Sequence, residues 1–197
     1  MKKFWAIATM LAVLGLAGVC QDKGRPAEGQ KAAGQAQSQA AQAAPAAAAN
    51  PEDVKSIDAI VKAVYACISG PAGHKRDWNR FRSLYLPGAR LVPTGRRANG
   101  EMGPRVFTVD EYVRNADPYF EKNSFYESEV ARQVNQYGHI AQVFSTYASR
   151  KAPGEAPFER GINGFDLAND GTRWWVVTVF WENESQENPI PEKYLKP

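Results

Sequence analysis

Two β-rich runs flank the turn Asn169-Asp170-Gly171 in the last third of this chain. The first run is Glu159-Arg160-Gly161-Ile162-Asn163-Gly164-Phe165-Asp166-Leu167, and the second is Thr172-Arg173-Trp174-Trp175-Val176-Val177-Thr178-Val179-Phe180-Trp181-Glu182. Asp-Gly between such runs predicts a hairpin, because the turn needs a positive φ that glycine adopts without strain. Working outward, residues 125–136 and 139–150 predict two further strands joined at Tyr137-Gly138. The last third is therefore expected to form four long antiparallel strands.

The clear helix signals all lie before these strands. Asn50-Pro51-Glu52-Asp53 predicts a helix start, and an apolar stripe then continues to the stop at Gly70-Pro71. A second helix is expected from Asp77 or Trp78 to Tyr85. The capping box in residues 108–111 predicts a third helix that reaches Phe120 and is kinked or restarted at Pro118. Short strands are expected at residues 89–93 and 105–107. Helices followed by a strongly curved antiparallel (mixed) sheet predict an α+β cone with three N-terminal helices and an internal pocket.

The composition allows one folded domain, which we expect over residues 51–197. The chain has 197 residues, of which 44% are hydrophobic and 11% aromatic, enough for one ordinary core. Residues 1–20 predict an export signal, since Met1-Lys2-Lys3 precedes an uncharged apolar run. Residues 21–50 are rich in Ala and Gln and predict a disordered tether.

The end of the signal allows two interpretations. Leu16-Ala17-Gly18-Val19-Cys20 resembles the lipobox of bacterial lipoproteins, although Val19 stands where that pattern places a small residue. Ordinary cleavage after Ala17 is the alternative. A tether after a cysteine favours lipidation of Cys20. We therefore expect attachment to the membrane through a lipid anchor, with the domain on the periplasmic or extracellular face.

Charge and cysteine content argue against several classes of function. Removing Lys2 and Lys3 with the signal lowers the formal net charge from +3 to +1, which gives no general case for nucleic-acid binding. No paired Cys or His spacing indicates a metal site, and no motif indicates a cofactor. The two cysteines are Cys20 and Cys67, and Cys67 is expected to be a small buried residue of the first helix.

The order of elements and several motifs resemble the nuclear transport factor 2-like superfamily, in particular a bacterial SnoaL-like subgroup. The motifs are Ile68-Ser69-Gly70-Pro71-Ala72-Gly73, Arg76-Asp77-Trp78, Arg160-Gly161-Ile162-Asn163 and Asp170-Gly171-Thr172-Arg173-Trp174-Trp175. The resemblance implies helices that cover the concave face of a bent sheet and enclose a pocket. Members of the superfamily include isomerases, cyclases, dehydratases and non-catalytic binding or assembly domains, so the fold alone does not imply an activity.

Aromatic and polar residues on the expected inner face are the candidates for ligand contacts. Alternation places Asn163 on the face opposite Arg160, and a buried Asn needs a hydrogen-bond partner. Arg160 could bind a ligand carboxylate or pair with a neighbouring acid. The candidate ligand-binding residues are Tyr65, Trp78, Tyr147, Arg160, Asn163, Trp175 and Trp181. They predict a pocket for a small apolar or aromatic ligand.

Catalytic residues are not assigned by any motif, and the weak candidates are Asp77 and His74. Asp77 also fits a helix N-cap, and His74 lies in a loop where polar residues commonly contact solvent. Abundant aromatics with few titratable groups favour binding over catalysis. An isomerase or cyclase that uses an Asp or His base is the alternative, and a buried carboxyl beside His74 or Tyr65 would favour it. A third alternative is an envelope assembly module that binds a protein partner.

Neighbouring aromatics of the last strand also predict self-association. Trp174, Trp175, Phe180 and Trp181 cannot all point into one cone, because adjacent strand positions face opposite ways. The outward residues need a cover, and a two-fold homodimer is the common solution. The alternative cover is the C-terminal tail, through Ile190, Tyr194 and Leu195.

Overall fold

The computed structural model describes residues 48–96 and 99–196, which belong to one compact unit. The predicted signal, its lipobox-like end with Cys20, and nearly all of the predicted tether lie outside the described residues. In the part of the chain that is described, every helix is too short or too polar to cross a membrane.

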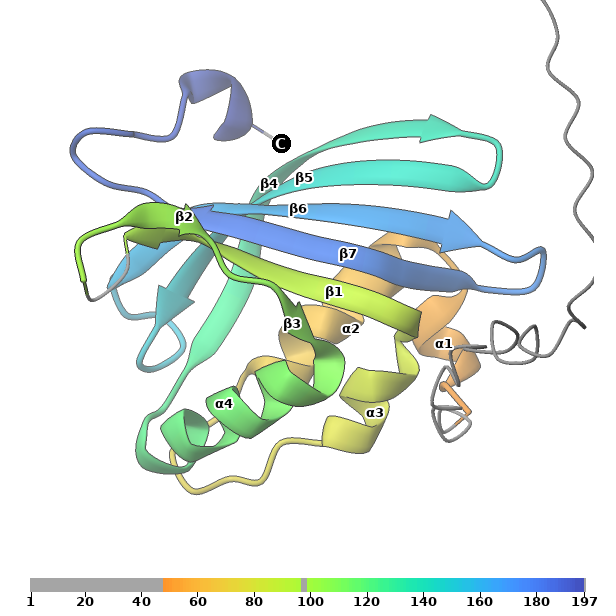
Figure 1. Ribbon diagram of the computed structural model, residues 1–197, viewed down its shortest axis with the longest axis horizontal. Helices are drawn as coiled ribbons and strands as arrows, with labels where there is room; N and C mark the ends of the chain where they lie inside the picture. Colours follow the sequence, from red (N-terminus) through yellow and green to blue (C-terminus); the bar gives the residue numbers. More distant parts are fainter. Residues whose placement is uncertain (1–47, 97–98, 197) are drawn as a thin grey trace, which may run out of the picture. The chain divides into compact units, whose positions relative to one another are not determined.

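Four α-helices pack on one face of a single mixed sheet (Figure 1). The helices are α1 (Pro51–Val54), α2 (Ile57–Ile68), α3 (Trp78–Ser83) and α4 (Val109–Lys122). The strands are β1 (Tyr85–Arg96), β2 (Met102–Pro104), β3 (Phe107–Thr108), β4 (Tyr126–Tyr137), β5 (Ile140–Arg150), β6 (Glu159–Asn169) and β7 (Trp174–Asn183). The sheet order is β2-β1-β7-β6-β5-β4, with β3 also paired to β1. Only the β1–β7 pair is parallel among the described strand pairs, so the predicted curved, mixed α+β architecture is confirmed.

The first predicted helix is two helices. Ser56 interrupts it with an extended backbone, and its side chain accepts a hydrogen bond from the Ala59 amide as the N-cap of α2. Asn50 caps α1 in the same way, from the Glu52 amide. A serine hydroxyl that competes for the backbone favours such a new start over helix continuation.

The second predicted helix ends earlier than expected, and β1 is much longer. Leu84 caps α3, and Tyr85 already pairs with Val176 of β7. The predicted strand at residues 89–93 is therefore the middle of a strand that begins at Tyr85. By contrast, the capping box between Thr108 and Glu111 is present, and α4 continues through Pro118 to Lys122.

The final hairpin forms as predicted. Gly171 has a φ of 95°, and the Asp170 carboxylate accepts hydrogen bonds from the amides of Thr172 and Arg173. The same carboxylate accepts from the Trp175 indole at 2.7 Å. These bonds hold the pKa of Asp170 far below its usual range and fix the four-residue connection between β6 and β7.

A β-bulge at Val177 reverses the two faces of the last strand. Asp166 pairs with Thr178 while Leu167 pairs with Val176, so Val177 is one residue in excess of the partner strand. Trp174 is consequently buried in the core before the bulge, and Trp181 packs against the core after it.

The C-terminal tail lies across the sheet face opposite the helices (Figure 1). Its 3-10 helix η1 (Glu192–Tyr194) places the Tyr194 ring 5.4 Å from the Phe144 ring. The Tyr194 carbonyl accepts a hydrogen bond from Thr146 at 2.5 Å, and the Lys193 carbonyl accepts from Gln133 at 2.9 Å. The tail therefore covers the part of the outer face around Phe144 and Phe180.

Candidate functional site

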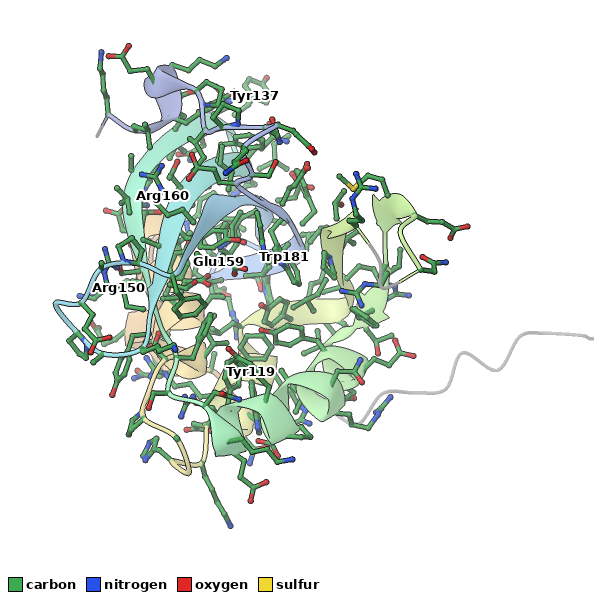
Figure 2. All side chains as sticks on the ribbon, turned by 90° about the vertical axis from the view of Figure 1, so that its left-hand side faces the viewer. Tyr119, Tyr137, Arg150, Glu159, Arg160 and Trp181 are labelled. Atoms are coloured by element: carbon green, nitrogen blue, oxygen red, sulfur yellow. The ribbon has the colours of Figure 1, made fainter. Side chains whose placement is uncertain are left out.

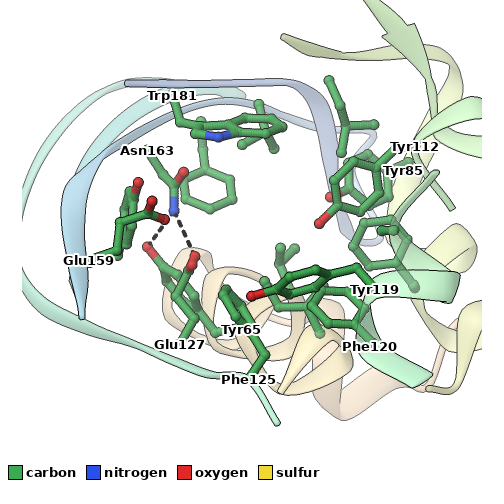
Figure 3. Close-up of a pocket in the computed structure, with 18 of the residues that line it drawn as sticks. Tyr65, Tyr85, Tyr112, Tyr119, Phe120, Phe125, Glu127, Glu159, Asn163 and Trp181 are labelled. Carbon is green, nitrogen blue, oxygen red and sulfur yellow. Dashed lines mark hydrogen bonds between the residues drawn. The ribbon is translucent and has the colours of Figure 1, made fainter. Parts of the chain in front are cut away.

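A cavity of about 360 Å³ lies between the helices and the concave face of the sheet (Figure 3). Its walls are mostly aromatic, with side chains from α2, α3, α4 and five strands. Tyr119 and Phe158 at its rim are about half exposed, at 46% and 47%. This volume is within the range of small-molecule sites, and the lining predicts a mostly apolar occupant with a few polar groups.

Asn163 is the centre of the polar wall. Its side-chain nitrogen donates to the Tyr65 hydroxyl at 3.1 Å and to the Glu127 carboxylate at 3.2 Å (Figure 3). The Tyr65 hydroxyl lies 2.7 Å from the hydroxyl of Ser145, which in turn donates to Glu129. Since Ser145 gives its proton to Glu129, Tyr65 donates to Ser145 and accepts from Asn163. The Tyr65 hydroxyl therefore uses both of these hydrogen bonds within the wall, and one of them holds the Asn163 amide in place.

Glu127 is a carboxyl group held in an apolar setting. Its strand β4 turns it toward Ser149 of β5, which donates to it at 2.9 Å. Burial penalises the carboxylate and raises the pKa of Glu127 to about 7, with the bonds from Ser149 and Asn163 acting in the opposite direction. At neutral pH this group is therefore divided between its acid and base forms.

A second carboxyl, Glu159, lies on the same wall. It accepts a hydrogen bond of 2.5 Å from the Asn183 amide, whose oxygen accepts from the Tyr147 hydroxyl at 2.7 Å. Burial raises the pKa of Glu159 above its ordinary value. Gly161 makes this arrangement possible, because a Cβ there would collide with the Tyr147 hydroxyl and with the Glu182 carbonyl.

Tyrosine hydroxyls occupy the opposite wall. Figure 3 shows Tyr85 and Tyr112 across the cavity from Glu127 and Glu159. The Tyr85 hydroxyl is buried and is the one buried side-chain polar atom of the described residues without a hydrogen-bond partner. Burial raises the pKa of both tyrosines, so both stay protonated donors. An unpaired buried hydroxyl is costly, and a ligand acceptor would satisfy it.

Searches with the sequence against family models and against curated proteins gave no match. Comparison with solved structures gave matches over most of each partner chain. A structure assigned as a calcium/calmodulin-dependent protein kinase type II association domain, from Thiobacillus denitrificans, is 10% identical and has a TM-score of 0.52. The match covers 66% of this chain and 96% of that one.

Two further matches are of the same kind. The β subunit assigned to an aromatic-ring-hydroxylating dioxygenase, from Novosphingobium aromaticivorans, is 11% identical with a TM-score of 0.50, covering 69% of this chain and 95% of that one. A nuclear transport factor 2-like protein of unknown function from Pseudomonas putida is 13% identical with a TM-score of 0.49, covering 72% and 94%. With its order of elements and the matches of TM-score 0.52 and 0.50, the domain has the nuclear transport factor 2-like fold. Likeness at this identity concerns the fold alone.

Four of the predicted ligand-binding residues line the cavity of this nuclear transport factor 2-like domain, namely Tyr65, Tyr147, Asn163 and Trp181. Trp78 lies behind the wall, where it packs on Phe120 and donates from its indole to Asp117 at 2.7 Å. Its role is to support the aromatic wall from outside.

Arg160 and Trp175 lie on the outer face and do not reach the cavity. Arg160 forms a two-pronged ion pair with Glu184, at 2.8 and 2.9 Å, and Figure 2 shows it beyond Glu159 on the outside of the sheet. The Arg173 guanidinium lies over the Trp175 ring, with its central carbon 3.6 Å from the ring centre. The bulge at Val177 is the reason that Trp175 and Trp181 do not share a face.

The two weak catalytic candidates, Asp77 and His74, lie outside the cavity, at a helix start and in a loop. The Asp77 carboxylate caps α3 by accepting from the Arg80 amide at 2.8 Å. His74 is exposed in the loop that Arg76 organises by donating to carbonyls of Ile68, Gly70, Pro71 and His74. Neither residue lines the cavity.

The two carboxyl groups of the cavity were not among the predicted site residues. Strand alternation from Asn163 through Gly161 places Glu159 on the inner face, so a signal for it existed in the sequence. Glu127 had a weaker signal, as a strand glutamate beside aromatic residues, a position that β-propensity disfavours. The described residues contain no cluster of His, Cys, Asp and Glu suited to a metal ion, and the thiol of Cys67 is buried in α2, which raises its pKa to about 12.

Proposed function

We propose that this domain is a small-molecule enzyme in which Glu127 moves a proton on a ring-sized, mostly apolar substrate. The observation that carries the proposal is the position of Glu127, in an aromatic cavity and with a pKa of about 7. A general base works best when its pKa lies near the pH at which it operates. Most surface glutamates are too weakly basic for this task.

The surroundings of Glu127 support a role in proton transfer. Asn163 and Ser149 hold the two carboxylate oxygens from two different strands, which fixes the group without neutralising it. The substrate would lie against the aromatic walls, with its acidic C–H or O–H group facing Glu127. Glu127 then takes the proton, and the bonding electron pair remains on the substrate.

A base-sensitive probe tests this proposal without knowledge of the natural substrate. Nitrobenzisoxazole loses its ring C–H proton to a base, its N–O bond breaks, and a coloured nitrile-bearing phenolate forms. We expect the purified chain to accelerate this reaction, with a rate that rises through about pH 7, and we expect Glu127→Gln to abolish the acceleration. Glu155→Gln, in an exposed loop, is the control for charge. Equal rates for the wild type and Glu127→Gln would contradict the proposal.

Binding without catalysis is the second candidate, and the hydrogen bonds of the site favour it. Glu127 already accepts from Asn163 and Ser149, and Tyr65 already donates within the wall. If the domain binds a ligand without catalysis, a neutral fluorescent probe such as phenylnaphthylamine binds equally well to the wild type and to Glu127→Gln. The proton-abstraction assay then shows no difference between them.

We also propose that the chain is exported and anchored to a membrane by lipid on Cys20, within a SnoaL-like subgroup of the fold. The support is the sequence alone, through its basic and apolar leader and the lipobox-like end. Mass spectrometry of the mature N-terminus distinguishes a lipidated Cys20 from an unmodified start at Gly18. An envelope assembly function would use the outer sheet face, and homodimerisation through that face would require displacement of the tail.

A further inference from the structure

Glu159 is a carboxyl group of the cavity that the proposed proton transfer does not use. It is half-buried on β6 and faces the same space as Glu127 and Trp181. Figure 2 shows Glu159 and Trp181 on the sheet side of the cavity and Tyr119 on the helix side. Its one described hydrogen-bond donor is the neutral amide of Asn183. Within residues 48–96 and 99–196, no cationic side chain pairs with it.

The cavity as a whole has the same excess of acidic over basic side chains. Among the described residues that line it are two glutamates and no Lys, Arg or His. The arginines nearest in sequence are engaged elsewhere, Arg160 with Glu184 and Arg132 with Glu129 and Asp58. Lys122 and Lys151 line a neighbouring depression on the other side of the rim residues Tyr119 and Phe158, and neither lysine lines the cavity. Two partly buried carboxyl groups without a counter-charge are energetically costly when ionised, and a bound cation would offset that cost.

The aromatic walls suit a cation as well as an apolar group. A ring face attracts an ammonium or guanidinium group within about 6 Å, most strongly when both are desolvated. The rings of Tyr112 and Trp181 meet at 90° with centroids 6.2 Å apart, so they present faces in two directions. The unpartnered hydroxyl of Tyr85, 3% exposed, independently indicates that a ligand completes this cavity.

We propose that the ligand of this cavity is an organic cation, an amine or quaternary ammonium on a small apolar frame, with Glu159 as its anionic anchor. The inference rests on the proposed function, because it names the substrate class of the same cavity. The cationic nitrogen lies between Glu159 and the rings of the sheet side. The apolar frame extends toward the helices, where Tyr85 donates to an acceptor on the ligand.

This arrangement implies that affinity depends on pH. The titratable groups that face Glu127 are Tyr65 from α2, Tyr112 from α4, Tyr147 from β5 and Glu159 from β6. The tyrosines stay neutral, since burial raises the pKa of each. Glu127, with a pKa of about 7, gains its negative charge near neutrality, so a cation binds more tightly as the pH rises through that value.

A matched pair of ligands tests the inference. Benzyltrimethylammonium and neopentylbenzene have nearly the same shape and differ in one positive charge. We would measure each by displacement of phenylnaphthylamine from the purified full chain at about pH 5 and about pH 8. We expect the cation to bind at least about tenfold more tightly than its neutral counterpart at the higher pH, with a smaller ratio at the lower pH.

Single variants assign the effect to Glu159. Glu159→Gln keeps an acceptor for Asn183 and should lower the affinity for the cation about tenfold, while the affinity for neopentylbenzene stays within about twofold. Glu155→Gln removes the same charge from an exposed loop and should change neither affinity. Circular dichroism and the melting temperature verify that each variant is folded.

The outcomes separate the two proposals. Equal or tighter binding of the neutral ligand, equal losses of both ligands in Glu159→Gln, or failure of both ligands to displace the probe would each overturn the cation inference. Loss of proton abstraction in Glu127→Gln would leave the proposed function standing in all of these cases. A wild type that abstracts the proton no faster than Glu127→Gln would overturn the proposed function itself, whichever ligand binds.

Discussion

The Tyr147 hydroxyl occupies the space in which a side chain on Gly161 would begin. The two residues face each other across β5 and β6, and Tyr147 reaches over Gly161 to donate to Asn183. Asn183 in turn donates to Glu159. One missing Cβ thus allows a chain of hydrogen bonds that ends at a cavity carboxyl.

Gly161→Ala should therefore disturb both stability and the site. The new methyl group meets the Tyr147 hydroxyl and also the Glu182 carbonyl, which is backbone and cannot turn away. We expect a loss of about 1–3 kcal/mol in the free energy of unfolding, measured by urea denaturation, together with weaker probe binding. Gly95→Ala on β1 is the control, since its Cβ would meet no atom within 4 Å. Equal stability of the two variants would refute this account.

The pH dependence of stability should carry the signature of Glu127. Its pKa rises from an ordinary 4.5 to about 7 on folding, so the folded state binds more protons between these values. Stability from this group is present below about pH 4.5 and is lost as the pH rises through about 7. We expect the difference in unfolding free energy between the wild type and Glu127→Gln to fall by on the order of 3 kcal/mol across that window.

Other carboxyl groups give the opposite slope, which is why the difference between two proteins is the quantity to measure. Hydrogen bonds and ion pairs outweigh burial and lower the pKa of Asp53 and of Glu184. The stability that these two groups contribute is therefore lost as the pH falls. Both groups are present in the wild type and in Glu127→Gln and cancel. A difference that does not vary with pH would show that Glu127 titrates as an ordinary glutamate.

Ligand binding should alter the fluorescence of Trp181 and not that of Trp175, although both lie on the last strand. Trp181 lines the cavity, whereas Trp175 lies on the outer face beneath Arg173. We expect a cavity ligand to change the emission of the wild type and of Trp175→Phe. Trp181→Phe should lose most of that change. Loss of the change in Trp175→Phe, with the change kept in Trp181→Phe, would show that the bulge is not at Val177.

Removal of the tail should change the state of association. Residues beyond Glu184 cover Phe144 and Phe180, and Tyr194 contributes a ring contact and a carbonyl acceptor. We expect a chain ended after Glu184 to associate at micromolar concentration and the full chain to do so less. Sedimentation velocity compares them. A tightly dimeric full chain would show that the tail and a second copy do not compete.

The sequence predicts the architecture well because its signals are local. Asp170-Gly171 specifies a turn, and the capping box of Thr108 and Glu111 specifies a helix start, whatever surrounds them. The helix break at Ser56 is not predicted, because the apolar spacing continues across it while its hydroxyl starts a new helix. The start of β1 at Tyr85 is not predicted either, because its pairing with Val176 depends on a strand far along the chain.

The site is harder to predict, since it depends on which residues meet across strands. Asn163 and Trp181 could be placed near a pocket, but period-two alternation holds only as far as the bulge and therefore misplaced Trp175. Glu127 became a candidate only once its register against Ser149 was known. Its pKa depends on how deeply its side chain is buried, which strand alternation does not give.

The tail belongs to the same molecule as the face that it covers, and this has a consequence for any partner. A segment joined through a short connection is present at its own site at an effective concentration on the order of millimolar. A protein that binds the outer sheet must outcompete Tyr194 and its neighbours at that concentration. Weak encounters are thus filtered out, and only a partner that captures the tail or binds far more tightly gains access.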